Sequence, residues 1–272
     1  MFVGRTRLVS DLRSLGVREG AVALVHCRMS ALGTVIGGAE TVVRALLDCV
    51  GASGTLIAYI GWEDGPPDQL DALSPEDREL VLAEHPVYDP QVGRARRDHG
   101  RLAEALRTWP AAVHSGHPEA GVVAIGARAH EIAITHPLDD AYGDGTPYAR
   151  VVESAGQVVM LGAPLSTVTL IHHAETIAAV TGKRRTSWRV PLMVDGERTW
   201  VTLLDVDTSS GALDYRGLCG DGDYVEWLAH DALASGAGRT GSIGAGVGHV
   251  FDAHALVTHT VRRIEDAFGS PR

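Results

Sequence analysis

Apolar residues in the first part of the chain switch between helical spacing and uninterrupted runs. Residues 8–15 carry leucines every three or four positions and end at Gly16, which predicts an amphipathic helix with a glycine C-cap. Residues 21–25 and 55–60 are continuous apolar runs, as expected for strands covered on both faces. A helical pattern at 40–50 lies between them. These elements predict a βαβ unit, and hence parallel strands.

The same patterns continue beyond an acidic, proline-rich segment at residues 61–98, which predicts a long irregular loop. Further helices are predicted at 101–108, at 127–134, from Pro147 and at 168–180, and further strands at 121–125 and 157–161.

Alternation with period two replaces these patterns at residues 187–194 and 198–204. The two stretches flank Asp195 and Gly196, and an Asp-Gly turn between alternating segments is a strong signal for an antiparallel hairpin. We expect this hairpin to be an insertion at about residues 184–206.

Helices are also predicted near residues 223–234 and 254–267, joined by a glycine-rich connection at 236–248. The expected fold is α/β, with a mostly parallel central sheet flanked by helices, the appended antiparallel hairpin and the C-terminal helices. We expect one domain over residues 1–272.

Composition limits the function classes. The formal charge is −10, which opposes nucleic-acid backbones and favours cationic small molecules, although acidic charge also serves solubility alone. The three cysteines are widely spaced and predict neither a disulfide framework nor a zinc knuckle. No apolar run is long enough for a membrane span. We therefore expect a soluble cytoplasmic protein, a monomer or homodimer, that binds neither nucleic acid nor membrane.

A histidine and a carboxylate follow the buried strand at 157–161, where α/β proteins place small-molecule sites. His172 and His173 diverge by roughly 100° on a helix, so only one of them can line a cleft. Glu175 lies on the same helix face as His172 and within reach of its ring. The pair suits a general base, although an isolated H-x-x-E is more often a surface histidine with an ordinary i,i+3 partner.

Zinc is the other interpretation of this cluster. Adjacent helical histidines diverge, H-E-x-x-H is absent, and a third ligand such as His117 would have to come from elsewhere. A metal-dependent hydrolase built on His172, Glu175 and His117 is therefore the weaker alternative, and we expect no metal.

Two other groups of residues are candidates for binding. The loop at 26–38 leads from the first core strand into a helix, and its serine, threonine and glycine backbone N–H groups suit a pyrophosphate or an acyl carbonyl, although a plain connecting loop is equally possible. Acidic residues after the second strand and near residues 221–226 offer carboxylates that can gather around a polycation.

Several short motifs occur in a fixed order along most of the chain. They are Leu24-Val25-His26, Ser30-Ala31-Leu32-Gly33, Trp62-Glu63-Asp64, His117-Pro118, Thr146-Pro147-Tyr148-Ala149-Arg150 and His172-His173-Ala174-Glu175. In this order they resemble the aminoglycoside 3-N-acetyltransferase family. The resemblance implies an acetyl-CoA-dependent enzyme, distinct in fold from the larger GNAT acetyltransferase superfamily, that acetylates the 3-amino group of 2-deoxystreptamine antibiotics and thereby confers resistance.

The resemblance also implies roles for individual residues. His172 takes the position of the catalytic base, supported by Glu175 and by a second acid, Glu226. Because Ser166 stands where the family often has Asp or Asn, we expect Glu226 to give the main support. The residues expected to hold acetyl-CoA are Arg28, Met29, Ser30, Ala31, Leu32, Gly33, Val35, His117, Thr146 and Pro147. The residues expected to receive the ammonium groups of the substrate are Glu63, Asp64, Glu104, Asp221 and Asp223.

An acetyltransferase of the same fold that acts on another amine, for example in secondary metabolism, is the nearer alternative. In either case we expect direct attack of the amine on the thioester, because no acyl-enzyme is required.

Overall fold

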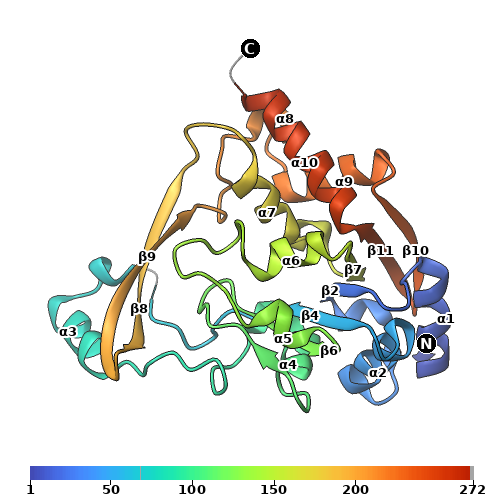
Figure 1. Cartoon of the computed structure of the whole chain (residues 1–272), viewed down its shortest axis with the longest axis horizontal. Helices are drawn as coiled ribbons and strands as arrows, with labels where there is room; N and C mark the ends of the chain where they lie inside the picture. The colour runs from blue at the N-terminus through green and yellow to red at the C-terminus, as the bar shows by residue number, and fades with distance from the viewer. Residues whose placement is uncertain (68, 270–272) are drawn as a thin grey trace.

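A central mixed sheet organises the fold in the computed structural model, which describes residues 1–67 and 69–269. Within those residues the sheet has seven strands in the order β10-β11-β7-β2-β4-β6-β5 (Figure 1). They are β2 (Val22–Cys27), β4 (Thr55–Tyr59), β5 (Val113–His114), β6 (Val122–Gly126), β7 (Gln157–Leu161), β10 (Gly238–Ile243) and β11 (Gly246–Asp252). Two short strands, β1 (Phe2–Val3) and β3 (Thr34–Val35), pair separately.

Parallel pairing is confined to the centre of this sheet. β2 pairs in parallel with β4 and β7, whereas the ladders on both flanks are antiparallel. The expectation of a mostly parallel sheet therefore holds for the three central strands and not for the flanks. The glycine-rich connection expected at 236–248 is the hairpin β10–β11, whose short turn requires antiparallel strands.

Two helical layers cover the sheet. α1 (Arg5–Leu15), α2 (Gly38–Val50) and α4 (Gly100–Arg107) contribute to the buried cluster on one face. α5 (Ala129–Ala133), α6 (Pro147–Glu153), α7 (Leu170–Ile177), α9 (Tyr224–Ala234) and α10 (Ala253–Phe268) contribute to the cluster on the other. Strand side chains alternate between the layers, so that Leu24 packs in one core and its neighbour Val25 in the other. None of the described helices is long and apolar enough to cross a membrane.

The helix ends follow the predicted capping chemistry. Gly16 closes α1 with φ 98°, a left-handed conformation that glycine adopts without strain. α6 begins after Thr146, whose side chain accepts a hydrogen bond from the N–H of Ala149. α7 is shorter than the helix predicted at 168–180, since it begins at Leu170 and ends at Ile177. Just after its end, Lys183 Nζ donates to the carbonyl of Ala178 at 2.6 Å.

The predicted hairpin forms from β8 (Arg185–Val194) and β9 (Glu197–Val206). Asp195 and Gly196 both have positive φ, as a type I′ turn requires. The hairpin packs on the long segment at 61–98 through a small buried cluster of Trp62, Tyr88, Val190, Leu192 and Leu203.

The long segment at 61–98 is not wholly irregular. It contains α3 (Pro75–Glu84), which begins after the capping side chain of Ser74. Arg198 and Trp200 of the hairpin donate to the carbonyl of Leu82 in α3. Figure 1 shows α3 and the hairpin together at one end of the molecule.

Candidate active site

A cavity of about 680 Å³ opens at the carboxyl ends of the central strands β2, β4 and β7. Its walls come from residues 25–30, Tyr59, residues 98–103 and parts of 163–172. Segments far apart in the chain meet here because parallel strands end at the same edge of the sheet. This is the position at which α/β proteins bind small molecules.

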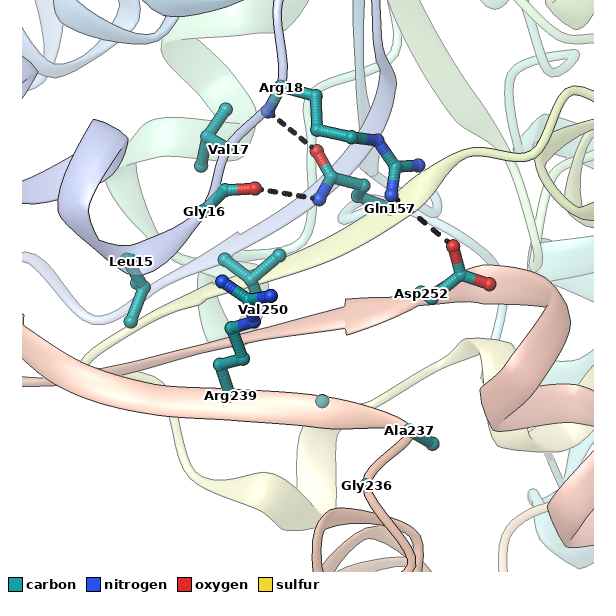
Figure 2. Close-up of a pocket in the computed structure, with 11 residues that line it drawn as sticks. Leu15, Gly16, Val17, Arg18, Gln157, Gly236, Ala237, Arg239, Val250 and Asp252 are labelled. Carbon is teal, nitrogen blue, oxygen red and sulfur yellow. Dashed lines mark hydrogen bonds and ion pairs between the residues drawn. The ribbon is translucent and has the colours of Figure 1, made fainter.

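A second cavity, of about 460 Å³, lies near the opposite edge, where β7 and β10 begin (Figure 2). The side-chain amide of Gln157 donates to the carbonyl of Gly16 and accepts from the N–H of Arg18. Arg18 also pairs with Asp252 at 3.3 Å. These groups pair with one another and tie α1, β7 and β11 together, which is a structural role. The candidate active site is therefore the cavity at the carboxyl ends of β2, β4 and β7.

His172 lines that cavity and Glu175 lies behind it. β7 leads through a 3₁₀ turn, Leu165–Thr167, into α7, which carries both residues. The Nδ1 atom of His172 lies 2.9 Å from Oε2 of Glu175, and the carboxylate is fully buried. The contact expected from the three-residue spacing is therefore present.

This contact sets the chemistry of the ring. An ionised carboxylate only accepts hydrogen bonds, so His172 Nδ1 must carry the proton that it donates to Glu175. The other ring nitrogen, Nε2, then has a free lone pair. His172 therefore brings a ring with an acceptor nitrogen to the cavity wall.

Glu175 has further donors on both oxygens. Oε1 accepts from the N–H of Ala212 at 3.0 Å and from the hydroxyl of Tyr215 at 2.9 Å. Oε2 accepts from the hydroxyl of Tyr224 at 2.9 Å, in addition to His172. Both oxygens of this buried carboxylate therefore have hydrogen-bond donors, as burial of a charged group requires.

His173 points elsewhere, as the helical period predicts. Its side chain is buried, and Nδ1 lies 2.6 Å from the carbonyl oxygen of Tyr142. Burial lowers the pKa of His173. One histidine of the pair therefore faces the cavity.

Glu226 does not support His172 in this structure. It lies in the first turn of α9, its side chain is 52% exposed, and its ion-pair partner is His230 at 3.9 Å. Asp223 is the N-cap of that helix and accepts a hydrogen bond from the N–H of Glu226 at 2.8 Å. The carboxylate that reaches His172 is Glu175, so the expected ranking of the two acids is reversed.

The predicted coenzyme residues divide into two groups. Arg28, Met29 and Ser30 line the cavity. The following residues do not line it: Leu32 is fully buried, Gly33 and Val35 lead into the β1–β3 pair, and Ala31 packs near Gly162.

His117, Thr146 and Pro147 also lie away from this cavity, inside the protein. His117 is fully buried, with Nδ1 accepting from the N–H of Ala120, and Thr146 and Pro147 begin α6. The sequence patterns expected to bind the coenzyme at these positions are structural in this conformation.

The predicted substrate acids are not gathered at the cavity either. Asp64 pairs with Arg94 at 2.6 Å, which lowers the pKa of that carboxyl. The remaining acids are Glu63, which pairs with Arg97, Glu104, which pairs with Arg107, Asp223, which caps α9, and Asp221, which is exposed. Apart from that of Asp221, their carboxylates bind arginines or backbone in this conformation, so an ammonium group would have to compete for them.

The polar residues Tyr59, His99 and Arg101 of the cavity wall were not predicted, and His26 was predicted only as part of the loop at 26–38. His26 Nε2 is buried without a hydrogen-bond partner among the described residues, and burial lowers the pKa of His26 to about 3. The rings of Tyr59 and His99 stack at 4.1 Å. The position of Tyr59 at the end of β4 is a signal that could have found it.

Cys27 also lines the cavity but is not a ready nucleophile. Burial raises the pKa of its thiol to about 12, so the thiol stays protonated near neutral pH.

The ligand set of the hydrolase alternative is not assembled. The His117 ring lies against His136 at 4.8 Å, and Nε2 of His117 has no partner within residues 1–67 and 69–269. Over the same residues, no group of three or more His, Cys, Asp or Glu side chains is arranged to hold a metal ion.

Comparison with known proteins defines the class. Residues 24–265 match the family model described as aminoglycoside 3-N-acetyltransferase, and the chain belongs to this family of acyltransferases. Aminoglycoside N(3)-acetyltransferase VIII of Streptomyces fradiae is 47% identical over 268 residues, covering 98% of this chain and 93% of the relative.

Solved structures agree with this assignment. Aminoglycoside acetyltransferase AAC(3)-Xa superposes with a TM-score of 0.96 at 43% identity, over 98% of this chain and 94% of the other. A binary complex of AAC-IIIb with CoASH gives a TM-score of 0.91 at 42% identity, over the full length of both chains.

Proposed function

We propose that the protein transfers the acetyl group of acetyl-CoA to the 3-amino group of 2-deoxystreptamine aminoglycosides, by direct attack, with His172 as the general base. The observation that carries this proposal is the 2.9 Å contact between His172 Nδ1 and the buried Glu175 carboxylate, which leaves Nε2 unbonded on a ring that lines the cavity. Acetylation replaces an ammonium group by a neutral amide, and so removes a charge on which such drugs rely.

The cavity wall fits the coenzyme. Arg28 and Arg101 supply two cations in a chain of net charge −10, and guanidinium groups bind phosphates well. Met29 and Leu102 provide apolar surface beside them for the pantetheine chain. We place the enzyme in the cytoplasm, where acetyl-CoA is available.

His172 accounts for the proton chemistry. An amine attacks only in its neutral form, and loss of its proton during attack needs a base near the nitrogen. The Glu175 contact orients the ring and stabilises the imidazolium that forms. Negative charge develops on the acetyl oxygen, and Met29 and Ser30, which begin a 3₁₀ turn on the same cavity wall, are the candidates to donate backbone N–H groups to it, since the N–H of Arg28 binds the carbonyl of Leu161.

Direct attack is supported by the state of the thiol at the site. Cys27, the cysteine of the cavity wall, has a pKa of about 12, which argues against an acyl-enzyme at that position. Incubation with acetyl-CoA labelled in its acetyl group should leave no label on the denatured protein. Stoichiometric protein-bound label would require a covalent route.

A CoA-release assay with gentamicin, apramycin and neomycin tests the function. We expect release with at least one of these drugs, and His172→Ala should lose at least about a hundredfold in turnover while still binding CoA. The exposed His230→Ala is the matched control and should keep parental turnover. Near-normal turnover in His172→Ala would reject the assigned base, and no release with any aminoglycoside would favour another amine as substrate.

A further inference from the structure

The chain from the end of β9 to the first residue of α9 closes over Glu175, with two donors on Oε1 and one on Oε2, the oxygen that also contacts His172. It supplies the N–H of Ala212 and the hydroxyl groups of Tyr215 and Tyr224, which we name together the carboxylate clamp. With His172, four donors occupy a carboxylate that can accept about four hydrogen bonds. The clamp therefore leaves Glu175 one orientation in which all of its acceptors are used.

We propose that Tyr215 and Tyr224 are positioning residues, which hold the Glu175 carboxylate charged and oriented so that His172 presents Nε2 to the substrate. The inference rests on the function proposed above. It concerns residues outside the cavity wall: Tyr215 contacts Glu175 Oε1, and the Tyr224 hydroxyl lies 2.9 Å from Glu175 Oε2 and 3.4 Å from His172 Nδ1.

The two phenol rings form a packed unit. Their centroids lie 4.4 Å apart with an interplanar angle of 9°. Gly211, with φ 82°, lies beneath them, and a Cβ atom there would meet the ring of Tyr215 at 2.8 Å and that of Tyr224 at 3.2 Å. Glycine is therefore required at this point for the rings to approach the backbone.

The segment is also anchored from the base of the β8–β9 hairpin. Arg184 donates to the carbonyls of Ser210 at 2.8 Å and Leu213 at 3.1 Å, and to Gly211 between them. A short helix, α8 (Arg216–Cys219), follows Tyr215 directly. The donors of the clamp are thus held by structure that does not touch the cavity.

Both phenols remain donors over the working range of pH. Burial, followed by the charge of Glu175, raises the pKa of Tyr215 and of Tyr224 well above the ordinary value for tyrosine. Neither hydroxyl loses its proton near neutral pH. Each therefore stabilises the ionised carboxylate and not a protonated one.

Removal of a hydroxyl should change the protonation of the pair and not substrate binding. With one donor fewer, the ionised form of the coupled Glu175–His172 pair is less stable, so the pair takes up a proton at higher pH. The acid limb of the pH profile of kcat should then move upward, and activity lost at neutral pH should return at higher pH.

The test compares Tyr215→Phe, Tyr224→Phe and the double variant. Each single change should lower kcat at pH 7 by roughly three- to tenfold and move the acid limb upward by roughly half to one pH unit, with KM for both substrates unchanged. Tyr148→Phe is the control, because it removes a buried hydroxyl that donates to the carbonyl of Ala120 at 2.8 Å and has no hydrogen bond to Glu175 or His172. It should leave the acid limb in place.

A second measurement separates this proposal from the proposed function. The proton on Nδ1 of His172 should give a low-field NMR resonance in the parent, assigned by its loss in His172→Ala. The resonance should shift or broaden in the clamp variants and not in Tyr148→Phe. An unchanged resonance and acid limb in both single variants would overturn the clamp, whereas a parent that shows the resonance but acetylates no aminoglycoside would overturn only the proposed function.

Discussion

The replacement of His117 by asparagine tests how a buried neutral histidine limits the pH range of the fold. His117 is fully buried, and its Nδ1 accepts a hydrogen bond from the N–H of Ala120 at 3.0 Å. Asparagine Oδ1 stands the same number of bonds from the backbone, so the variant can keep this acceptor while it removes a titrating ring. Burial, with His136 nearby, lowers the pKa of His117 to about 3.

The magnitude follows from proton linkage. Below its ordinary pKa of 6.5, His117 takes up a proton in the unfolded chain but not in the folded protein, so the free energy of unfolding falls as pH falls. Between pH 7 and pH 5 the loss from this one residue is about 2 kcal/mol. This loss of free energy is set by the pKa of His117 in the unfolded chain, because its pKa in the folded protein lies well below pH 5.

Urea unfolding followed by tryptophan fluorescence at the two pH values measures this loss. The free energy of unfolding should fall by about 2 kcal/mol less in His117→Asn than in the parent. His130→Asn replaces an exposed histidine of α5, so its free energy of unfolding should fall between the two pH values by as much as that of the parent. An equal decline in all three proteins would refute the reasoning, and a raised KM for acetyl-CoA in His117→Asn would return this residue to the coenzyme site.

Two further predictions concern the cavity. Arg28→Ala and Arg101→Ala should each raise KM for acetyl-CoA roughly tenfold with little change in kcat, since each loses a charged donor to phosphate. The control Arg13→Ala on α1 should change neither constant. An unaltered KM in both cavity variants would show that the phosphates bind elsewhere. Glu175→Gln should lower kcat at least about tenfold, because the glutamine amide cannot accept hydrogen bonds from all four donors. The control Glu226→Gln should keep kcat within about a factor of two of the parent. A larger loss of kcat in Glu226→Gln than in Glu175→Gln would make Glu226 the supporting acid.

Local patterns predicted much of the fold. β7 and the β8–β9 hairpin lie close to their expected bounds, because apolar runs and an Asp-Gly turn act over a few residues. The hairpin β10–β11 was missed because its glycines mask the alternation of a strand. The direction of the flanking strands depends on how distant segments pair, which no local pattern encodes.

In the candidate site, too, the sequence predicted the local contacts and not the contacts between distant segments. The contact between His172 and Glu175 follows from helical spacing. Tyr215 and Tyr224 were not predictable, because they reach Glu175 from 40 and 49 residues away. His117 shows the converse: a histidine beside proline resembles a loop ligand in sequence, and only the packing shows that it is fully buried.

The interleaved strand order also constrains how the protein is made. β2 pairs with β7, and the turn after β10 bonds back to the loop that follows β2 through the N–H of Ala245 and the carbonyl of Leu32. A nascent chain that has emerged only as far as Val206 therefore holds His172 and Glu175 but lacks the clamp and this brace. The full set of donors around His172 and Glu175 forms only with the last quarter of the chain, so we expect a premature stop even late in the coding sequence to abolish activity.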